Sequence, residues 1–375
     1  MKKALSALAA LCFATSVSAQ GSLSVQGFGY PPGQISTRTQ GMGGGPAELD
    51  ATSALNPASV VDVGPTQIYL QYDPEFRTVS SGGATSKTTT ARFPIVSVIF
   101  PLTSRLSLGI GSSTLVDRSS LTKSSVLQVI DTSTVTVEQS VRVLGAIDDV
   151  RAAFGYSISP AFRIGLGAHL ITGTNQLTLI QRFPDSARFS NLVETSRVSY
   201  SGTAFSGGFE LHPSKLLALG VSARKGGTIR AESGDTLLAT AKAPDHYGAS
   251  VQYFGWGGVD LSAHLARDQW TAMGALTSKS VTAYDSWDVG GGIEAEGPRF
   301  LGRASVLRLG VRHRTLPFST TGSSVSELSI GGGLGLDLAR NRARLDIGLL
   351  HAGRSSSDPV KEHAYILSLG LRVVP

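Results

Sequence analysis

The feature that most constrains this chain is an apolar residue at every second position, repeated in segment after segment. In residues 105–111, Leu106, Leu108 and Ile110 fall on one face of an extended chain, while serine and glycine fall on the other. Side chains alternate between faces along a strand, so such a segment has one apolar face and one small or polar face. The same alternation recurs at 162–170, 328–338 and 344–349. The pattern predicts an all-β chain.

About fourteen such strands are predicted, and the connections between them alternate in length. The predicted strands are 66–73, 91–100, 105–115, 145–157, 161–171, 196–211, 215–225, 245–254, 257–267, 285–296, 304–314, 325–338, 341–352 and 361–373. Every second connection is a tight turn, such as residues 158–160. The intervening connections are long and polar, such as residues 116–144. Short turns at one end and long loops at the other are typical of bacterial outer-membrane barrels.

Alternation alone leaves a soluble β-sandwich open. The number of strands and the asymmetry of the connections favour a transmembrane antiparallel β-barrel. In hydrocarbon every backbone N–H and C=O needs a partner within the protein, and a closed sheet supplies one without leaving an edge. The leucine faces would contact lipid of the outer membrane, and the glycine, serine and charged faces would line the interior.

Composition excludes several other classes of protein. The 375 residues include 44 glycines and only 16% charged residues, against about 25% charged in an ordinary soluble protein. After the first twenty residues, no apolar run reaches the ~20 residues that a transmembrane helix needs. The formal net charge of +6 is too small and too scattered to indicate nucleic-acid binding.

Residues 1–19 predict an export signal. Lys2 and Lys3 form a basic start, an apolar stretch follows, and Ala19 ends a run of small residues suited to cleavage. Cleavage there would remove Cys12, which is the single cysteine of the chain. The mature chain would then have no thiol for a disulfide or a thiolate metal site.

Residues 20–65 show little strand signal but carry a recognisable order of residues. A glycine-rich stretch, Gly41-Met42-Gly43-Gly44-Gly45, is followed by Asp50 and then by Asn56-Pro57-Ala58. Between an export signal and a barrel, this order resembles the N-terminal region of the FadL family of outer-membrane transporters for long-chain fatty acids and other hydrophobic compounds. The resemblance implies that residues 20–65 fold as a plug inside a barrel formed by residues 66–375.

The resemblance also implies where the plug is held. In the FadL family the Asn-Pro-Ala stretch abuts an inward kink of the third strand, where a lateral gap lets the ligand pass into the membrane. The third predicted strand carries Gly109 and Gly111 on its inward face. Asn56, Pro57, Ala58, Gly109 and Gly111 are therefore the candidate plug and gating residues. Two plainer interpretations stay open, because inward glycines occur in most of these strands and asparagine before proline often starts a turn.

Charged residues gather on the inward faces of the later strands. Arginines in a narrow lumen would suit a carboxylate ligand, which they bind through paired hydrogen bonds. The alternative, which we favour, is a set of ion pairs that fill the barrel or anchor the plug. The candidates are Arg308, Arg312, Arg344, Arg372, Asp337 and Asp346.

One predicted strand, residues 196–211, changes the face of its apolar residues along its length. Tyr200 fits the starting register, whereas Phe205 and Phe209 fall on the other face. The change indicates either a β-bulge or an apolar patch inside the lumen, and the pattern leaves both open.

The sequence predicts no enzyme. Catalysis at an outer-membrane barrel needs a nucleophile or water activated by a histidine that a carboxylate orients. Seven histidines are scattered over different strands and loops, and the best placed, His246, follows Asp245 without a serine motif or metal-ligand spacing. No catalytic residue, cofactor or metal is expected.

The chain is therefore predicted to be a protein of the bacterial outer membrane that passes hydrophobic, long-chain fatty-acid-like molecules through a plugged barrel. The alternatives are a related barrel that serves as a protein-interaction or secretion platform, and an open polar porin. An apolar lumen would favour transport, and a lumen packed with ion pairs would favour the platform. The expected partners are outer-membrane lipid, a hydrophobic small-molecule ligand and the barrel-assembly machinery, with no nucleic acid. The chain ends in Val374-Pro375 rather than in the aromatic residue that this machinery commonly reads.

Overall fold

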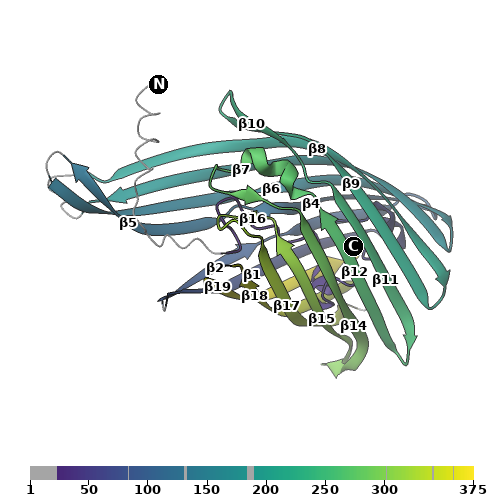
Figure 1. Ribbon diagram of the computed structural model, residues 1–375. Helices are drawn as coiled ribbons and strands as arrows, with labels where there is room; N and C mark the ends of the chain where they lie inside the picture. Colours follow the sequence, from purple (N-terminus) through teal and green to yellow (C-terminus); the bar gives the residue numbers. More distant parts are fainter. Residues whose placement is uncertain are drawn as a thin grey trace.

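The structure is a computed structural model in which seventeen strands form one sheet, and its first and last strands pair with each other. It describes residues 23–82, 84–130, 133–183, 190–300, 302–339, 342–357 and 359–375. The predicted export signal lies outside these residues. Every ladder of the sheet is antiparallel, so the pairing of β1 with β19 closes a barrel (Figure 1). The predicted fold class is confirmed.

The strands of the barrel follow one another around the ring in chain order. They are β1 (Gln67–Ser81), β2 (Ala84–Arg92), β3 (Ile95–Pro101), β4 (Leu106–Asp117), β5 (Ser120–Ile130), β6 (Ser133–Ser159), β7 (Phe162–Arg182), β8 (Leu192–Ser214), β9 (Leu217–Ser233), β10 (Thr236–Lys242), β11 (His246–Trp256), β12 (Val259–Asp268), β14 (Ser286–Phe300), β15 (Arg303–Leu316), β17 (Val325–Leu338), β18 (Ala343–Ser355) and β19 (Lys361–Val373).

Three staves of the barrel are each broken into two strands. β2 and β3 both pair with β1, β4 and β5 both pair with β6, and β10 and β11 both pair with β9. The seventeen strands therefore make fourteen staves, which is the predicted number. Pro94 lies at the first break, where its missing N–H removes a donor from the ladder.

Five short elements lie between or inside the staves. They are α2 (Thr37–Gly41), η2 (Pro57–Asp62), η3 (Trp270–Leu276), β13 (Thr282–Ala283) and β16 (Phe318–Ser319). The last two pair as a small separate sheet beside η3. Within the described part of the chain, no helix is long and apolar enough to cross a membrane.

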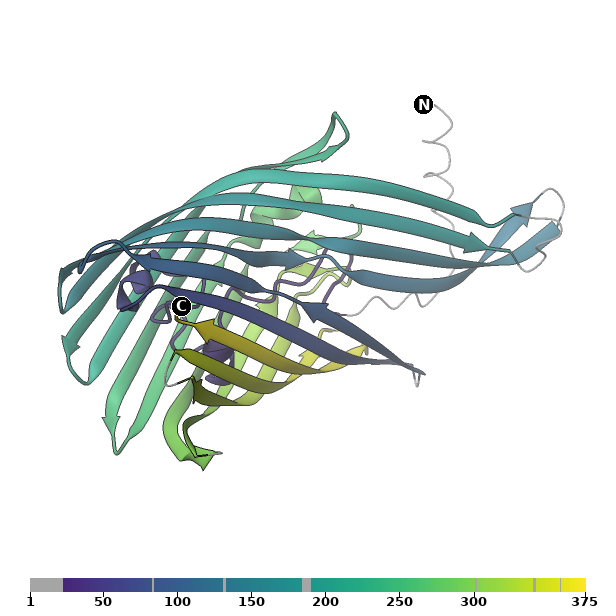
Figure 2. The ribbon, with the colours of Figure 1, turned by 180° about the vertical axis from the view of Figure 1, so that it is seen from behind.

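The strands run further toward the loop end than the sequence predicted. Residues 74–90, 116–144, 172–195 and 226–244 were expected to be polar loops, and much of each is strand; β6 alone has 27 residues. Figure 2 shows β5 to β8 extending well beyond the neighbouring strands. Beyond an apolar belt both faces of a strand meet water, so the apolar alternation fades while the backbone pairing continues. The prediction of loops there was wrong for that reason.

Outward and inward faces differ as the alternation predicts. On β7, Leu166 is 72% exposed, whereas Ile171 is fully buried inside. Leu309, Ile330 and Leu349 are among the other exposed side chains. An outward band of this kind contacts lipid hydrocarbon in membrane barrels.

The apolar residues of β8 lie on both faces because the lumen here is apolar. The ladder between β7 and β8 has no break, and side chains at even positions of β8 point inward from Tyr200 to Glu210. Tyr200 is buried among apolar side chains inside the barrel, whereas Phe205 is 67% exposed outside. The register shift between Gly202 and Ala204 places the extra residue in β9. Of the two interpretations left open by the sequence, the apolar patch inside the lumen is the right one.

Residues 23–65 lie inside the ring of strands, as the purple segment of Figures 1 and 2 shows. Four apolar residues of this segment are each at most 2% exposed: Leu23, Ile35, Met42 and Val60. Residues 23–65 form no strand of their own that could bury these side chains. Their burial comes from the inward faces of the barrel. We call residues 23–65 the inner segment; the boundaries of a plug and its role in gating stay predictions.

Candidate functional site: the barrel interior

The Asn-Pro-Ala stretch begins the short helix η2, which lies on a patch of wall made of glycines. The Asn56 side chain accepts a hydrogen bond from the Ala58 N–H (2.9 Å) and donates to the carbonyls of Glu48 (2.8 Å) and Phe209 (3.3 Å). A Cβ on Gly165 of β7 would lie 2.3 Å from the Ala58 nitrogen. Only glycine permits so close an approach of two backbones.

Neighbouring strands complete this glycine seat. A Cβ would lie 2.6 Å from Val61 at Gly155, 2.2 Å from the Asn56 carboxamide oxygen at Gly208, and 3.0 Å from Val60 at Gly109. The glycine seat is therefore Gly109, Gly155, Gly165 and Gly208, contributed by β4, β6, β7 and β8. Its members come from four successive neighbouring staves, so it forms when these staves pair.

The predicted gating residues are partly brought together. Asn56, Pro57 and Ala58 lie on β6, β7 and β8, and the contact to the third stave passes through Val60 on Gly109. A Cβ on Gly111 would instead meet Ser97 of the adjacent strand β3, at 2.7 Å. The break in the third stave lies further along, between β4 and β5. A gating role for these residues stays a prediction.

A second glycine contact holds the glycine-rich turn after α2. A Cβ on Gly310 of β15 would lie 2.1 Å from the Gly43 nitrogen, and one on Gly292 of β14 would lie 2.6 Å from the Met42 carbonyl oxygen. Arg38 of α2 adds a bidentate pair to Glu294 of β14, at 2.8 and 3.1 Å. The glycine run of β14 and the single glycine of β15, Gly310, thus lie along the path of the inner segment.

Asp50 holds the inner segment together from within. It accepts hydrogen bonds from the Thr39 hydroxyl (2.8 Å), the Thr52 hydroxyl (2.7 Å) and the Ser36 hydroxyl. Burial raises the pKa of Asp50, but Arg38 and these hydrogen bonds outweigh it and hold the pKa below its ordinary value. The carboxylate is therefore charged at neutral pH and fixes the turn between α2 and η2.

One side of the lumen is closed by an ion-pair network around Tyr30. Arg354 pairs with Glu75 (2.7 Å), Glu327 (2.5 Å) and Glu362 (2.5 Å), and its Nη2 donates to the Tyr30 hydroxyl (3.1 Å). We define the Tyr30 network as Tyr30, Glu75, Arg77, Arg92, Asp117, Arg314, Glu327, Arg354 and Glu362, which are joined by ion pairs and ring contacts. Four arginines face four carboxylates, so its formal charge is zero.

The predicted lumen charges form a smaller set of pairs nearer the turn end. Arg308 binds Glu294 (2.5 Å) and Asp346 (2.7 Å), and Arg344 binds Asp337 (3.4 Å) and Asp346 (3.3 Å). These contacts are consistent with ion pairs that fill the barrel, which the sequence analysis favoured over a carboxylate-binding site. Arg312 pairs with Asp288 (2.8 Å), and Arg372 borders a cavity of about 440 Å³ at the turn end. A ligand-binding role for them stays untested.

The opposite side of the lumen is apolar. Its buried side chains come from β4, β6, β7, β8 and β9, and from the inner segment, η3 and β16. We call this cluster the apolar chamber; its members are Phe28, Leu115, Val116, Ile147, Ile171, Tyr200, Ile229, Ala231, Ala243, Trp270, Met273, Val281 and Phe318. The rings of Phe28 and Phe318 lie 4.6 Å apart, and those of Trp270 and Phe318 lie 5.8 Å apart. The chain's own side chains fill this chamber.

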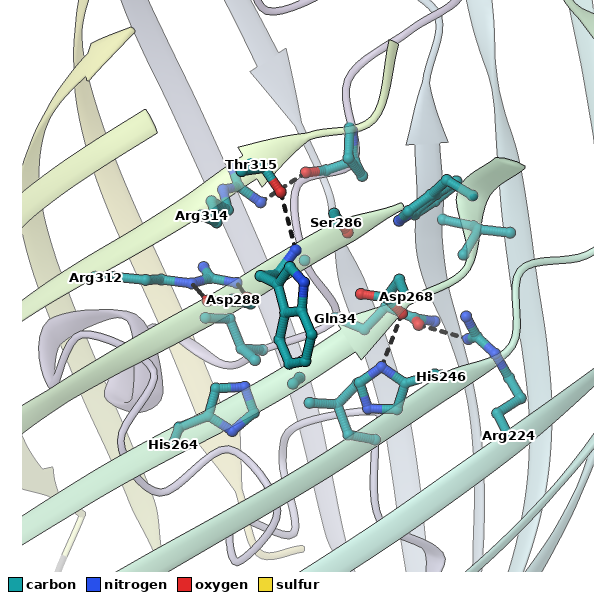
Figure 3. Close-up of a pocket in the computed structure, with 18 residues that line it drawn as sticks. Gln34, Arg224, His246, His264, Asp268, Ser286, Asp288, Arg312, Arg314 and Thr315 are labelled. Atoms are coloured by element: carbon teal, nitrogen blue, oxygen red, sulfur yellow. Dashed lines mark hydrogen bonds and ion pairs between the residues drawn. The ribbon is translucent and has the colours of Figure 1, made fainter. Parts of the chain in front are cut away.

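A small polar cavity lies between the two sides (Figure 3). His246 faces Asp268 (2.8 Å) there, and Arg224 donates to the Gln34 side chain (2.7 Å). Its volume of about 50 Å³ has room for a few water molecules and no more. No group of His, Cys, Asp and Glu among the described residues has a geometry that could hold a metal ion.

Three lumen residues are hydrogen-bonded in the order of a hydrolase triad. His169 contacts Asp149 through Nδ1 (2.7 Å) and Ser206 through Nε2 (2.8 Å). Asp149 also accepts hydrogen bonds from Gln34 of the inner segment (3.0 Å) and from Arg224 (3.0 Å). Ser206 borders neither the 50 Å³ cavity nor the 20 Å³ cavity beside η2, so neither gives a substrate access to it. The arrangement anchors Gln34 to the wall.

Comparison with known proteins assigns the chain to a family. The sequence model of the BamG family matches residues 1–230 of the 375. The chain belongs to the BamG family. The matched part of this BamG-family protein spans the inner segment and the strands from β1 to β8, which together carry the whole glycine seat. No curated protein matches it by sequence.

Solved structures show which fold this BamG-family protein has. A Pseudomonas aeruginosa FadL homologue has a TM-score of 0.63 at 10% identity, over 92% of this chain and 99% of that one. The Pseudomonas putida toluene transporter TodX has 0.61 at 14%, over 92% and 98%, and the Ralstonia pickettii toluene transporter TbuX has 0.60 at 15%, over 94% and 100%. The resemblance to FadL is thereby confirmed for the fold. These neighbours are transporters rather than enzymes.

Proposed function

We propose that this BamG-family barrel lies in the bacterial outer membrane and passes small hydrophobic molecules through its apolar chamber. The outward apolar band supports the location, because exposed side chains of this kind need hydrocarbon around them. The fold shared with FadL-like and toluene transporters supports the role. Long-chain fatty acids and monoaromatic compounds are the two substrate classes to compare.

The apolar chamber is the observation that carries this proposal. Trp270 and Met273 enter it from η3, in the connection between β12 and β13, while Phe28 enters from the inner segment. A connecting segment can move without unpairing the barrel, and its departure would leave an apolar space lined by the wall residues Ile147 and Ile171. In this structure the chain's own side chains fill the apolar chamber, where the transported molecule would lie.

Uptake of radiolabelled toluene and of radiolabelled oleate tests the role. Cells that lack their own hydrophobic-compound channels would express the full chain, and uptake should exceed that of cells with an empty vector. Trp270→Ala empties part of the chamber and should raise uptake of the preferred compound. Trp256→Ala is the matched control, since Trp256 is 65% exposed at the turn end. Uptake at the vector level for both compounds, with normal amounts of folded protein, would contradict transport.

A second candidate is a protein-handling platform, which the Tyr30 network favours. A lumen crossed by four buried arginines and four carboxylates is costly to open, since removing one charge leaves its partner buried and unpaired. Membership of the BamG family, whose label suggests a link to barrel assembly, also supports this candidate. Co-purification of the intact chain with barrel-assembly proteins from its own membrane would test it, and isolation of the chain alone in mild detergent would count against it.

A further inference from the structure

The barrel wall parts between its second and third staves. β3 and β4 pair from Ile95 opposite Ser113 to Pro101 opposite Ser107, and one more backbone hydrogen bond joins Thr114 to the Pro94 carbonyl (2.9 Å). Beyond this point toward the loop end, and within the described residues, β2 pairs only with β1 and β5 only with β6. We call this place the parted seam. Two strand edges there lack a ladder partner.

A cavity of about 830 Å³ lies at the parted seam. It is larger than the cavity of about 440 Å³ at the turn end, and much larger than the two cavities of about 50 and 20 Å³ deeper in the lumen. Its lining comes from both unpaired strands, with Thr88 and Thr90 of β2 and Ser120 and Thr122 of β5 among the hydroxyl groups. The space therefore borders both edges that lack partners.

On its β2 side, the seam lies beyond the apolar band. Phe93, which follows β2, is 62% exposed and belongs to that band. Further along β2, the positions that share its face are Ala91, Thr89 and Lys87, which are small or polar and match lipid hydrocarbon poorly. Three apolar side chains are exposed on the β5 side: Leu121, Leu127 and Val129.

The edge that begins the seam already binds an extended residue. Tyr30 of the inner segment forms an isolated antiparallel bridge with Asp117, the last residue of β4. Both backbone hydrogen bonds are formed, Tyr30 N–H to the Asp117 carbonyl and Asp117 N–H to the Tyr30 carbonyl, each at 2.8 Å. β5 continues the same stave past Arg118 and Ser119, and no described residue forms such a bridge with it.

The charge around the cavity has one sign. Lys87, Lys123 and Arg142 line it and are exposed, and no ion pair found among the described residues involves them. Arg77 also lines it but is occupied by Glu75 at 2.8 Å. Among the described residues that line the cavity there is no aspartate or glutamate. The cavity is therefore suited to an acidic occupant.

We propose that the parted seam binds an acidic, extended segment of a partner protein, which adds as a strand to the free edge of β5. A strand edge binds an extended chain through main-chain hydrogen bonds, and nearby side chains select its sequence. Here Lys87, Lys123 and Arg142 would select glutamate or aspartate. The proposal goes beyond transport and is independent of whether the apolar chamber carries a ligand.

Peptide binding to the purified full chain in detergent tests the proposal without any transport readout. The probe is a fluorescein-labelled, end-capped ten-residue peptide that alternates threonine and glutamate, followed by fluorescence anisotropy. Reversal of the three cations, Lys87→Glu, Lys123→Glu and Arg142→Glu together, should weaken its binding by about tenfold or more. The matched control reverses Arg197, Lys242 and Lys279, which are exposed on the same end of the barrel, and should change binding less than about twofold.

Two N-methylated peptides separate strand addition from simple charge attraction. One is methylated on every threonine nitrogen and the other on every glutamate nitrogen, so each lacks the N–H donors of one edge. Strand addition predicts that at least one of them binds about tenfold more weakly than the parent peptide, because it loses a row of main-chain hydrogen bonds. Equal binding of all three would overturn the proposal. So would failure of the parent peptide to bind, or preferential binding of polygalacturonate, which would assign the seam to an anionic glycan.

Discussion

The two sides of the barrel interior are closed by different kinds of contact. On the side of β1, β15, β17, β18 and β19, the Tyr30 network crosses the lumen with charges in fixed partnership. On the side of β4 and β6 to β9, the apolar chamber is filled by side chains from η3 and the inner segment. Ion pairs need particular partners at particular distances, whereas apolar contacts need only volume to be filled. A hydrophobic molecule can replace the second kind of contact but not the first.

This difference assigns separate tasks to the two sides. The polar side holds Tyr30, and through it the start of the inner segment, in one position. On the apolar side, the side chains that fill the lumen include those of η3, which belongs to a connecting segment that can move. The predictions below alter the polar side, the contacts of the glycine seat, or the hydrogen bond between Ser206 and His169, and none of them changes a residue of the apolar chamber.

The largest effect is expected from Arg354→Ala on the polar side. The Arg354 side chain is fully buried and is shared by Glu75, Glu327 and Glu362, so its loss leaves buried carboxylates without their main partner. The stability of the folded barrel should fall by about 3–5 kcal/mol. Urea unfolding in lipid vesicles, followed by the gel mobility of unheated samples, measures it. Arg344→Ala, at a pair that is partly exposed and longer, is the control and should cost less than about 1 kcal/mol; equal losses for both variants would show that the Tyr30 network has no special weight.

Gly165→Val should displace η2 from the wall. The added carbon atoms would overlap the Ala58 backbone, and overpacking of this kind costs about 1–3 kcal/mol. Limited proteolysis should then cut the inner segment, which resists cutting in the unaltered chain. At Gly207 a Cβ would have 3.7 Å to its nearest neighbour, so Gly207→Val is the control and should leave the segment protected. If the two variants were cut at the same rate, the glycine seat would not be what holds η2.

Asn56→Ala should loosen the same contact more mildly. It removes the cap of η2 and the hydrogen bonds to Glu48 and Phe209, for a loss of about 0.5–2 kcal/mol. The midpoint of thermal unfolding should fall, together with faster proteolysis of the inner segment. Asn191→Ala, at an exposed position in the connection between β7 and β8, provides the comparison and should leave both quantities unchanged.

The smallest effect is expected at Ser206. Its hydrogen bond to His169 is one of several contacts that anchor Gln34, so Ser206→Ala should cost no more than about 1 kcal/mol. A fluorophosphonate probe should not label Ser206 in the folded barrel. Stoichiometric labelling that disappears in Ser206→Ala would show a reactive serine and would revive an enzymatic role for this side of the lumen.

The alternation of apolar residues was sufficient to predict the number of staves, because the two-residue period of a strand is local. It also predicted the outward face of strands such as β7, but it left β8 open, where apolar residues lie on both faces. The Asn56-Pro57-Ala58 stretch was found by its resemblance to a known order of residues. A gating role for the stretch stays a prediction, and its contact with Gly165 of β7 could not be read from the sequence. That contact depends on how η2 packs against the paired staves.

The Tyr30 network was missed for a physical reason. Glu75 and Arg77 lie where β1 leaves the apolar band, so their stretch was predicted to be a loop, and Tyr30 lies in a segment with no period at all. If β1 had been predicted to extend further, the two-residue alternation would have placed Glu75 and Arg77 on its inward face and identified them as lumen residues. Their partners, such as Arg354, lie hundreds of residues away and become neighbours only when β1 pairs with β19. Trp270 and Met273 were missed because a connecting segment that packs inward has no periodic signature.

Ion conductance in planar lipid bilayers tests most directly whether the inner segment seals this barrel. The unaltered chain should show no steady conductance above the bare membrane, because the Tyr30 network and the apolar chamber close the lumen between its loop end and the cavity of about 440 Å³ at its turn end. A chain without residues 21–60 serves as the positive control and should open stable, ion-passing steps. A steady open-pore conductance from the unaltered chain would contradict a sealed interior and would favour a polar porin instead.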